Sequence, residues 1–315
     1  MKQILALVAL VMFLGFAKGQ DKMFALPEFG ENTKSSRIVW SDDATMLAIA
    51  NGLDLAVCDV KSRKKLWQMR HLDWRIIWPN FAFSPDGKYL AVAVIDKTLV
   101  LDAKTGKLVK ELSRSGDTGI SWRGDDLWLM TKRSYVLYDA KKFEFKEGAQ
   151  NFFLNRVIGV EENKGETLVV LGRDGTDLAT VYSVKASKSK LTVFRREKGN
   201  FLAYHAGKTL FQAKKGDYEV RSLVENEKLG NFSLDGEEDE NFGFSSCGNY
   251  IAIGGSSGKV RLYHFTGKEK LVINYGKGFA KREEGGHWVT AFAVSHGAEY
   301  LAIGGSDGVK IYTVK

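Results

Sequence analysis

The chain has 315 residues, of which 44% are hydrophobic and 12% aromatic, and it carries a formal net charge of +8. This apolar content is enough for a substantial core, and the length permits one large all-β domain or two smaller ones. The basic residues are scattered along the sequence, which favours solubility and, weakly, acidic partners. We expect no nucleic-acid partner, because the protein is predicted below to be exported.

The first twenty residues differ from the rest of the chain. After a short basic start, residues 4–16 are apolar, and Ala17 and Gly19 place small side chains where a signal peptidase cuts. A membrane anchor is the alternative, but the apolar run is short for a span. We therefore predict a signal peptide over residues 1–19. Residues 20–315 then form a single exported domain, periplasmic or extracellular, with no membrane span after signal removal.

One pattern recurs along the remaining chain. Residues 83–112 contain three short β-branched or aromatic runs, separated by turn residues such as Pro85-Asp86-Gly87-Lys88. A meander of this size cannot bury both of its faces alone, so it should be one unit of several. Anchor residues at the end of the first strand recur at intervals of roughly forty residues, which is typical of four-stranded propeller blades. The anchors are Ser41, Ser84, Ser121, Glu162, Tyr204, Ser245 and Ser295. The spacing predicts seven units.

The innermost strands of these units show a second regularity. Side chains two positions apart share one face of a strand, so bulky and small residues at fixed positions predict how neighbouring units pack. We expect the bulky face of one inner strand to meet the small face of the next. The bulky residues are Phe81, Phe201, Phe242 and Phe292, and the small ones are Ala82, Gly119, Gly243 and Ala293.

The two ends of the mature chain complement each other. The last unit stops after its third strand, over residues 309–315, and lacks an outer strand. Residues 23–29 lie just upstream of the first unit, at the distance from it where an outer strand is expected. We predict that they pair with residues 309–314 and close the ring, and Pro27 is compatible with that edge position. A loose N-terminal tail is the alternative.

Several of these motifs resemble the blade consensus of the WD-repeat β-propeller family. They are Phe83-Ser-Pro-Asp-Gly-Lys, Leu99-Val-Leu-Asp and Lys104-Thr-Gly-Lys. The resemblance covers nearly everything after the first twenty residues. It implies an all-β, seven-bladed propeller of four-stranded antiparallel blades, with an N-terminal outer strand on the last blade. On this basis we expect a monomeric, non-enzymatic scaffold that binds a protein or a peptide.

The chain departs from the family pattern in two respects. No blade ends in Trp-Asp, and in the last unit Tyr312 takes the Trp position. The buried His–Asp network that the family resemblance implies can be proposed only for His287 with Asp307. We therefore assign structural roles to His287, Asp307 and Tyr312.

Two groups of residues are candidates for partner binding. One stands four positions before the anchors, where the innermost strands begin, and should ring one mouth of the central channel. Its members are Arg37, Asn80, Asp117, Asn200 and Asn241. Alternatively, these residues satisfy backbone groups at the strand starts and channel waters. The second group is Trp74, Arg75 and Trp78, because Trp and Arg dominate interface hot spots. Alternatively, these tryptophans cover a seam between blades.

The sequence contains little that predicts catalysis, a metal or a cofactor. The acidic stretches at residues 235–240 and 174–177 have carboxylates for calcium but match no calcium loop, so we predict no metal. The histidines show no metal-binding spacing, and no nucleophile-elbow motif occurs. We expect Cys58 and Cys247 to be free thiols, since they lie in different blades. The alternative to a scaffold is a lactonase- or glycosidase-like hydrolase with carboxylates at the channel mouth.

Overall fold

The computed structural model describes most of the chain between Lys22 and Val314, and all structural statements below refer to that part. The described residues are 22–25, 37–51, 54–70, 80–94, 96–116, 119–131, 134–150, 156–163, 166–172, 178–185, 190–198, 200–205, 207–214, 216–234, 241–245, 247–254, 259–274, 289–305 and 308–314. Every regular element in these segments is a β-strand.

The described strands pair into seven four-stranded sheets, each antiparallel throughout. The first four sheets consist of β2 (Arg37–Trp40), β3 (Met46–Asn51), β4 (Asp54–Asp59) and β5 (Lys64–Arg70); β6 (Phe81–Phe83), β7 (Tyr89–Ala93), β8 (Thr98–Asp102) and β9 (Leu108–Leu112); β10 (Gly119–Arg123), β11 (Asp126–Met130), β12 (Ser134–Asp139) and β13 (Phe145–Gln150); and β14 (Arg156–Asn163), β15 (Glu166–Gly172), β16 (Leu178–Lys185) and β17 (Lys190–Lys198).

The remaining three sheets consist of β18 (Asn200–His205), β19 (Lys208–Lys214), β20 (Asp217–Ser222) and β21 (Lys228–Ser233); β22 (Asn241–Phe244), β23 (Tyr250–Gly254), β24 (Lys259–His264) and β25 (Glu269–Asn274); and β26 (Val289–Val294), β27 (Tyr300–Gly305), β28 (Gly308–Thr313) and β1 (Lys22–Ala25). The last sheet combines strands from both ends of the sequence.

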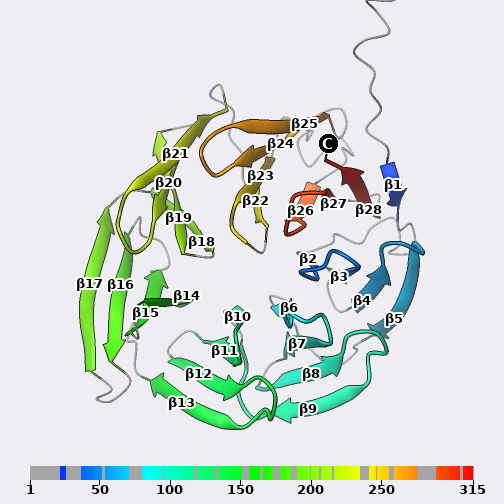
Figure 1. The fold of residues 1–315 in the computed structure, drawn as a ribbon, viewed down its shortest axis with the longest axis horizontal. Coiled ribbons are helices and arrows are strands. Elements are labelled where there is room, and N and C mark those ends of the chain that lie inside the picture. Colours follow the sequence, from blue (N-terminus) through cyan, green and yellow to red (C-terminus); the bar gives the residue numbers. More distant parts are fainter. Residues whose placement is uncertain are drawn as a thin grey trace, which may run out of the picture.

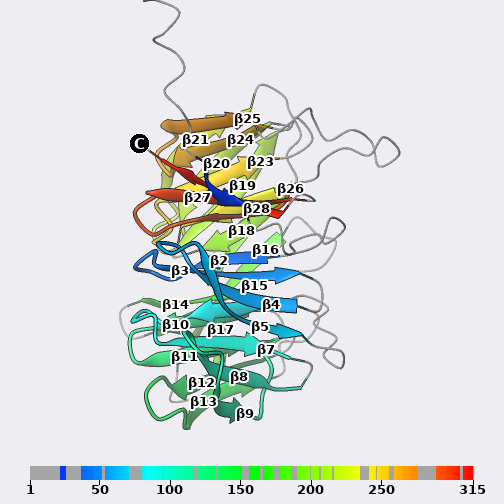
Figure 2. The same cartoon turned by 90° about the vertical axis from the view of Figure 1, so that its right-hand side faces the viewer.

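The sheets follow one another in chain order around a common centre (Figure 1). The first strand of each sheet lies nearest that centre and the fourth lies on the outer rim (Figure 1). Seen from the side, the strands run across the thickness of the ring (Figure 2). This arrangement is a β-propeller, as the sequence predicts.

The last sheet obtains its outer strand from the start of the chain. Strand β1 pairs antiparallel with β28, with Lys22 opposite Tyr312 and Ala25 opposite Lys310. The register shifts between these two pairs. Residues 26–29, which the predicted closing strand also includes, lie outside the described residues.

The serine anchors hold the first hairpin of four sheets. Each serine is buried, and its Oγ accepts a hydrogen bond from the backbone N–H five residues later. The pairs are Ser41 with Met46 (2.9 Å), Ser84 with Tyr89 (2.9 Å), Ser245 with Tyr250 (3.1 Å) and Ser295 with Tyr300 (2.9 Å). The recurring serine is therefore explained by local structure, because its hydroxyl satisfies a backbone donor that the turn leaves open.

The third sheet corrects the predicted register. Arg123 pairs with Asp126 across a tight turn at Gly124, which has a φ of 54°. Its inner hairpin is two residues shorter than the serine-anchored ones, so Arg123, and not Ser121, ends the inner strand. The predicted position of Gly119 shifts with it. Gly119 is the first residue of β10, and Asp117 precedes the strand, outside the described residues.

The packing of bulky against small residues is confirmed where the sixth sheet meets the seventh. A Cβ added to Gly243 would lie 2.7 Å from Cβ of Phe292, and one added to Gly254 would lie 2.6 Å from Cζ of the same ring. Phe292 is only 6% exposed. The inner strands approach so closely that Ser245 forms an isolated parallel bridge with Val294. Only glycine leaves room for the ring and the neighbouring backbone here.

Tryptophan side chains connect adjacent sheets, which the sequence does not predict. Each indole Nε1–H donates a hydrogen bond to a backbone carbonyl of the neighbouring sheet. The pairs are Trp40 to Ala293 (2.9 Å), Trp67 to Ala103 (2.8 Å) and Trp122 to Ala82 (3.0 Å). Two of these acceptors are the small residues Ala82 and Ala293. Their short side chains are compatible with the close approach of the indole.

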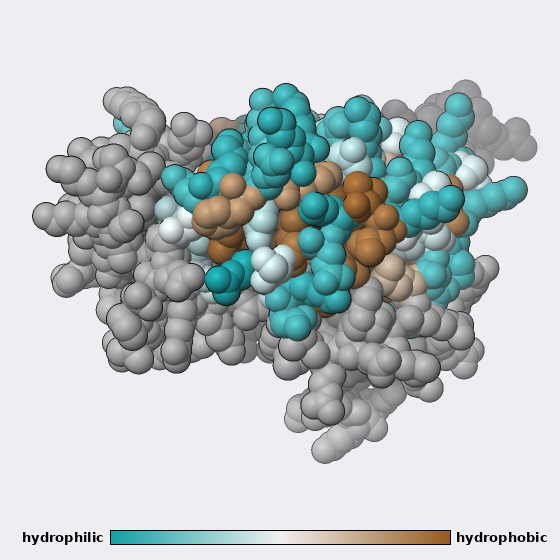
Figure 3. Space-filling model, turned by 90° about the horizontal axis from the view of Figure 1, so that it is seen from below, coloured by the Kyte–Doolittle hydropathy of each residue, from teal (hydrophilic) through white to brown (hydrophobic). Residues whose placement is uncertain are grey.

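The outer rim carries the exposed apolar side chains. Among described residues, the large hydrophobic side chains that are exposed all lie on the fourth strands of the first three sheets. They are Leu66, Leu108, Val109 and Phe145, with exposed fractions between 40% and 64%. Figure 3 shows hydrophobic groups among hydrophilic ones on this side of the molecule. They lie at or beside register shifts in the outermost strand pairs, where the pairing is irregular.

Candidate functional site

One register position gathers around the centre of the propeller. It is the residue near the start of the inner strand that lies opposite one of the last three residues of the second strand, and we call the set the start positions. The start positions are Arg37, Asn80, Gly119, Arg156, Asn200, Asn241 and Ala291. Four of them match the sequence prediction, whereas Gly119 takes the place predicted for Asp117. Two arginines and three asparagines therefore occupy these positions, and none of them carries a carboxylate.

Arg37 and Asn80 form the part of this site whose side chains are described in detail. Arg37 Nη1 donates a hydrogen bond of 2.6 Å to Oδ1 of Asn80, in the neighbouring sheet. The guanidinium carbon lies 5.6 Å from the centroid of the Phe81 ring, within the range of a cation–π contact. Asn80 and Phe81 are both buried. The amide and the ring therefore fix the orientation of the guanidinium between two sheets.

Burial governs the electrostatics of Arg37. It lowers the pKa of the guanidinium to about 10, because desolvation disfavours the charged form. The group is still protonated at neutral pH. No described carboxylate lies within ion-pair distance of it, whereas rim lysines such as Lys97 and Lys146 pair with Glu111 and Asp126. The inner site thus holds a partly desolvated cation that is hydrogen-bonded to a neutral amide.

Only some of the remaining candidate residues lie in the described part of the chain. Trp74, Arg75, Trp78, Asp117, His287 and Asp307 lie outside the described residues. The backbones of Asn200 and Asn241 begin β18 and β22. Tyr312 is 4% exposed and packs in the cluster that contains Phe292. Its backbone lies between Leu301 and Lys22.

Carboxylates in the described turns are held by the turns themselves. Asp102 accepts hydrogen bonds from the Thr105 hydroxyl (2.7 Å) and backbone N–H (2.8 Å), and these bonds lower its pKa. The backbone N–H groups of Lys142 and Lys141 lower the pKa of Asp139 in the same way. Such Asx-type turns explain these residues without any ligand.

The described residues contain no cluster of three His, Cys, Asp or Glu side chains able to hold a metal ion. The acidic stretches at residues 235–240 and 174–177 lie outside that part of the chain. Neither Cys58 nor Cys247 forms a disulfide, as predicted. Cys247 Sγ donates a hydrogen bond of 3.0 Å to the carbonyl of His296. A search of the described segments finds no helix long and apolar enough to span a membrane.

Comparison with known proteins shows a partial match to one family and a shared fold with several solved structures. Residues 38–125 match the family model described as the anaphase-promoting complex subunit 4 WD40 domain. The crystal structure of the RRP9 WD40 repeats is similar to this chain, with a TM-score of 0.65 and 17% identity over 91% of this chain and 96% of that one. Residues 38–125 thus resemble a WD40 domain, and the described chain has the fold of WD40-repeat propellers. A search of curated proteins finds no match to it.

Other solved structures share the fold at low identity. Hydrazine synthase of Kuenenia stuttgartiensis is similar with a TM-score of 0.64 and 14% identity, covering 95% of this chain and 99% of that one. Raptor of Chaetomium thermophilum gives a TM-score of 0.69 and 12% identity, over 90% of this chain and 28% of that one. These likenesses include proteins with very different names, so they describe the fold of this propeller and not its ligand.

Proposed function

We propose that this WD-repeat propeller is an exported scaffold that binds a protein or peptide and performs no catalysis. The leader-like residues 1–19 support export, and removal of that segment would leave a monomeric domain. We further infer seven blades in a closed ring, with β1 as the outer strand of the last blade. The antiparallel pairing of β1 with β28 and the seven described sheets support this inference.

The chemistry of the start positions carries the proposal. Arginine and asparagine side chains donate and accept hydrogen bonds but are poor nucleophiles and poor general acids or bases at neutral pH. A propeller hydrolase would need carboxylates at this level, and none of the start positions has one. The turn carboxylates Asp102 and Asp139 are hydrogen-bonded within their own turns. The site is therefore better suited to binding than to bond cleavage.

We place the partner on the face where the inner strands begin. The start positions supply polar contacts there, and Arg37 with Asn80 is the best-defined pair. Trp74, Arg75 and Trp78 come between β5 and β6 in the sequence, and we propose that they contribute to the same face. Aromatic anchors beside a polar centre would match the usual composition of an interaction hot spot.

Capture of partners by the mature protein tests this proposal. The bait is wild-type residues 20–315, and the fraction is the periplasm or culture medium of the source cell. We expect at least one protein to be retained by the wild type and lost from a Trp74→Ala, Trp78→Ala variant or from an Asn200→Ala, Asn241→Ala variant. A Leu108→Ser variant, changed on the exposed rim, serves as the matched control.

Two results would contradict the proposal. One is that the wild type retains nothing specific. The other is that the rim variant loses the partner while both face variants keep it, which would move the interface to the outer strands. Sequencing of the N-terminus of the exported protein tests the leader separately, and the expected first residue is Gln20.

A further inference from the structure

Arg37 is a partly buried cation whose contacts within the described structure are all neutral. Its hydrogen bond goes to the Asn80 amide and its ring contact to Phe81. Taking a charge out of water is unfavourable unless another charge compensates it. Structural arginines of a core therefore usually pair with carboxylates. Among the described residues Arg37 has no such partner.

Asn80 binds one side of the Arg37 guanidinium, and the other N–H donors of the group stay accessible. Arginine has five N–H donors in a planar fork, and Asn80 accepts from Nη1. Arg37 is partly exposed, so a ligand from solvent can reach its remaining donors. They form an edge that is oriented by Asn80 and open to a ligand.

The surrounding register position has the same sign of charge. Arg156 occupies the start position of the fourth sheet, opposite Gly172. The third sheet has Gly119 there and the seventh has Ala291, opposite Met130 and Gly304 respectively. Asp117, the one acidic residue that the sequence pattern predicts for this ring, lies outside the described residues, and Gly119 takes the register position predicted for it. The charged residues of the start positions are both cationic.

We propose that Arg37 is an oxyanion-binding residue that receives a carboxylate or phosphate group from a bound peptide. The inference rests on the proposed binding function and specifies its ligand. A planar guanidinium matches the two oxygens of such a group and can form two parallel hydrogen bonds. Asn80 acts as a positioning residue, because its amide oxygen fixes the guanidinium plane.

The test measures fluorescence anisotropy with dye-labelled peptides on the mature protein. Three probes of equal length are used: an oligo-glutamate, an oligo-glutamine and a phosphoserine peptide. We expect the wild type to bind an anionic probe and to bind the glutamine probe at least tenfold more weakly. Binding led by the phosphoserine peptide assigns the site to phosphate, and binding led by the glutamate peptide assigns it to carboxylate.

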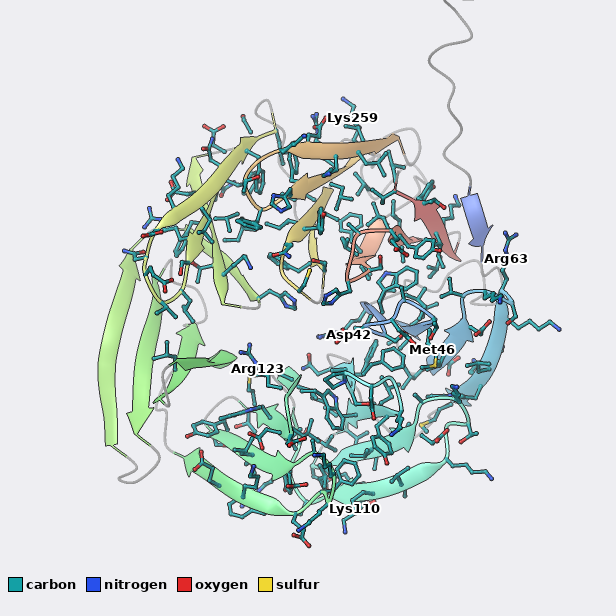
Figure 4. All side chains as sticks on the ribbon, in the orientation of Figure 1. Asp42, Met46, Arg63, Lys110, Arg123 and Lys259 are labelled. Atoms are coloured by element: carbon teal, nitrogen blue, oxygen red, sulfur yellow. The ribbon has the colours of Figure 1, made fainter. Side chains whose placement is uncertain are left out.

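Variants of Arg37 and Arg63 distinguish binding at Arg37 from a general attraction of the anionic probe to the positively charged protein. Arg37→Gln should weaken binding of the anionic probe about tenfold or more, as loss of a charge-assisted pair does. Arg37→Lys should weaken it less, because the charge remains but the fork is lost. Arg63→Gln is the matched control, since it removes the same charge from the outer edge of the molecule (Figure 4). Its affinity should stay within about twofold of wild type, because exposed charges beyond roughly 10 Å are screened.

Equal losses in Arg37→Gln and Arg63→Gln would overturn the proposal, and so would the same affinity of wild type for all three probes. The melting temperature provides a second readout. Removing an uncompensated cation should leave it unchanged or raise it, whereas a structural arginine would lower it. If Arg37→Gln does not fold, undiminished binding by Arg37→Lys would refute the bidentate site, and weaker binding would support it. Partner capture that survives Arg37→Gln would refute this inference while leaving the proposed scaffold function intact.

Discussion

The contact between the sixth and seventh sheets gives a sharp prediction for Gly243→Ala. The added methyl would lie 2.7 Å from Cβ of Phe292, 2.9 Å from its carbonyl oxygen and 3.0 Å from its carbonyl carbon. Two of these atoms belong to the backbone of β26, so relief would require the strand to move. Overpacking of this kind costs about 1–3 kcal/mol. Replacing glycine returns only about 0.4–1 kcal/mol through the unfolded chain. The clash should win, and we expect a net loss of about 1–2 kcal/mol.

Gly254→Ala is the informative comparison. Its added methyl would meet the tip of the Phe292 ring at 2.6 Å, and the next atoms, the Lys259 carbonyl oxygen and Val260 Cγ2, lie at 3.1 Å. Shortening the ring to leucine should therefore relieve Gly254→Ala but not Gly243→Ala. In a double-mutant cycle, Phe292→Leu should couple favourably with Gly254→Ala by about 1 kcal/mol and with Gly243→Ala by much less.

Urea unfolding followed by tryptophan fluorescence measures these free energies. The reasoning would be refuted if Gly243→Ala stabilised the protein. It would also be refuted if Phe292→Leu rescued both glycine variants equally, because the backbone contact would then be unimportant.

Three other predictions follow from the structure. Removal of residues 20–25 deletes β1 and should lower the melting temperature by several degrees, and an unchanged value would argue against ring closure. Asp102→Ala should cost about 0.5–1.5 kcal/mol at neutral pH. Since the folded pKa of Asp102 is held below 3.8 by Thr105, its contribution is present above that value and is lost as the pH falls through the folded pKa. Urea titrations in which variant and wild type differ equally at acidic and neutral pH would contradict this. Binding of the anionic probe should decline as the pH rises through about 10, where Arg37 loses its proton, and anisotropy that is constant to higher pH would exclude Arg37.

Much of the architecture could be predicted from the sequence because turn chemistry repeats with the strands. The Ser-Pro-Asp-Gly turn at Ser84 marks a hairpin end, and the structure shows why. Ser84 Oγ accepts from the Tyr89 N–H and donates to Asp86 at 2.7 Å. Local hydrogen bonds of this kind depend on a few adjacent residues. They are therefore readable without knowledge of the fold.

The register of the third sheet could not be read in the same way. Ser121 and Asp139 have the same separation as Ser84 and Asp102, but the match is a coincidence. The hairpin at Arg123 is two residues shorter, and a compensating offset places Ser121 inside the strand, opposite Trp128. Spacing alone cannot distinguish a short turn from a displaced anchor. Because Ser121 lies two residues before the end of the strand, the predicted start position falls on Asp117 and not on Gly119.

The contacts of the site were also beyond sequence reasoning. Arg37 and Asn80 were both predicted near the centre, but their direct hydrogen bond depends on how two sheets pack. The same holds for the indole bond from Trp40 to Ala293, residues at opposite ends of the chain. Such contacts join distant segments, and no local pattern encodes them. A signal was nevertheless present in Arg37, a cationic residue beginning a strand whose other residues are apolar.

Hydrogen exchange with and without the anionic probe that binds best tests the binding account most directly. Amide protection measured by mass spectrometry reports which segments the ligand covers. The account predicts added protection at the starts of β2 and β6, around Arg37 and Asn80, and none on the outer strands β9 and β13. Protection confined to those outer strands, with β2 and β6 unchanged, would contradict it.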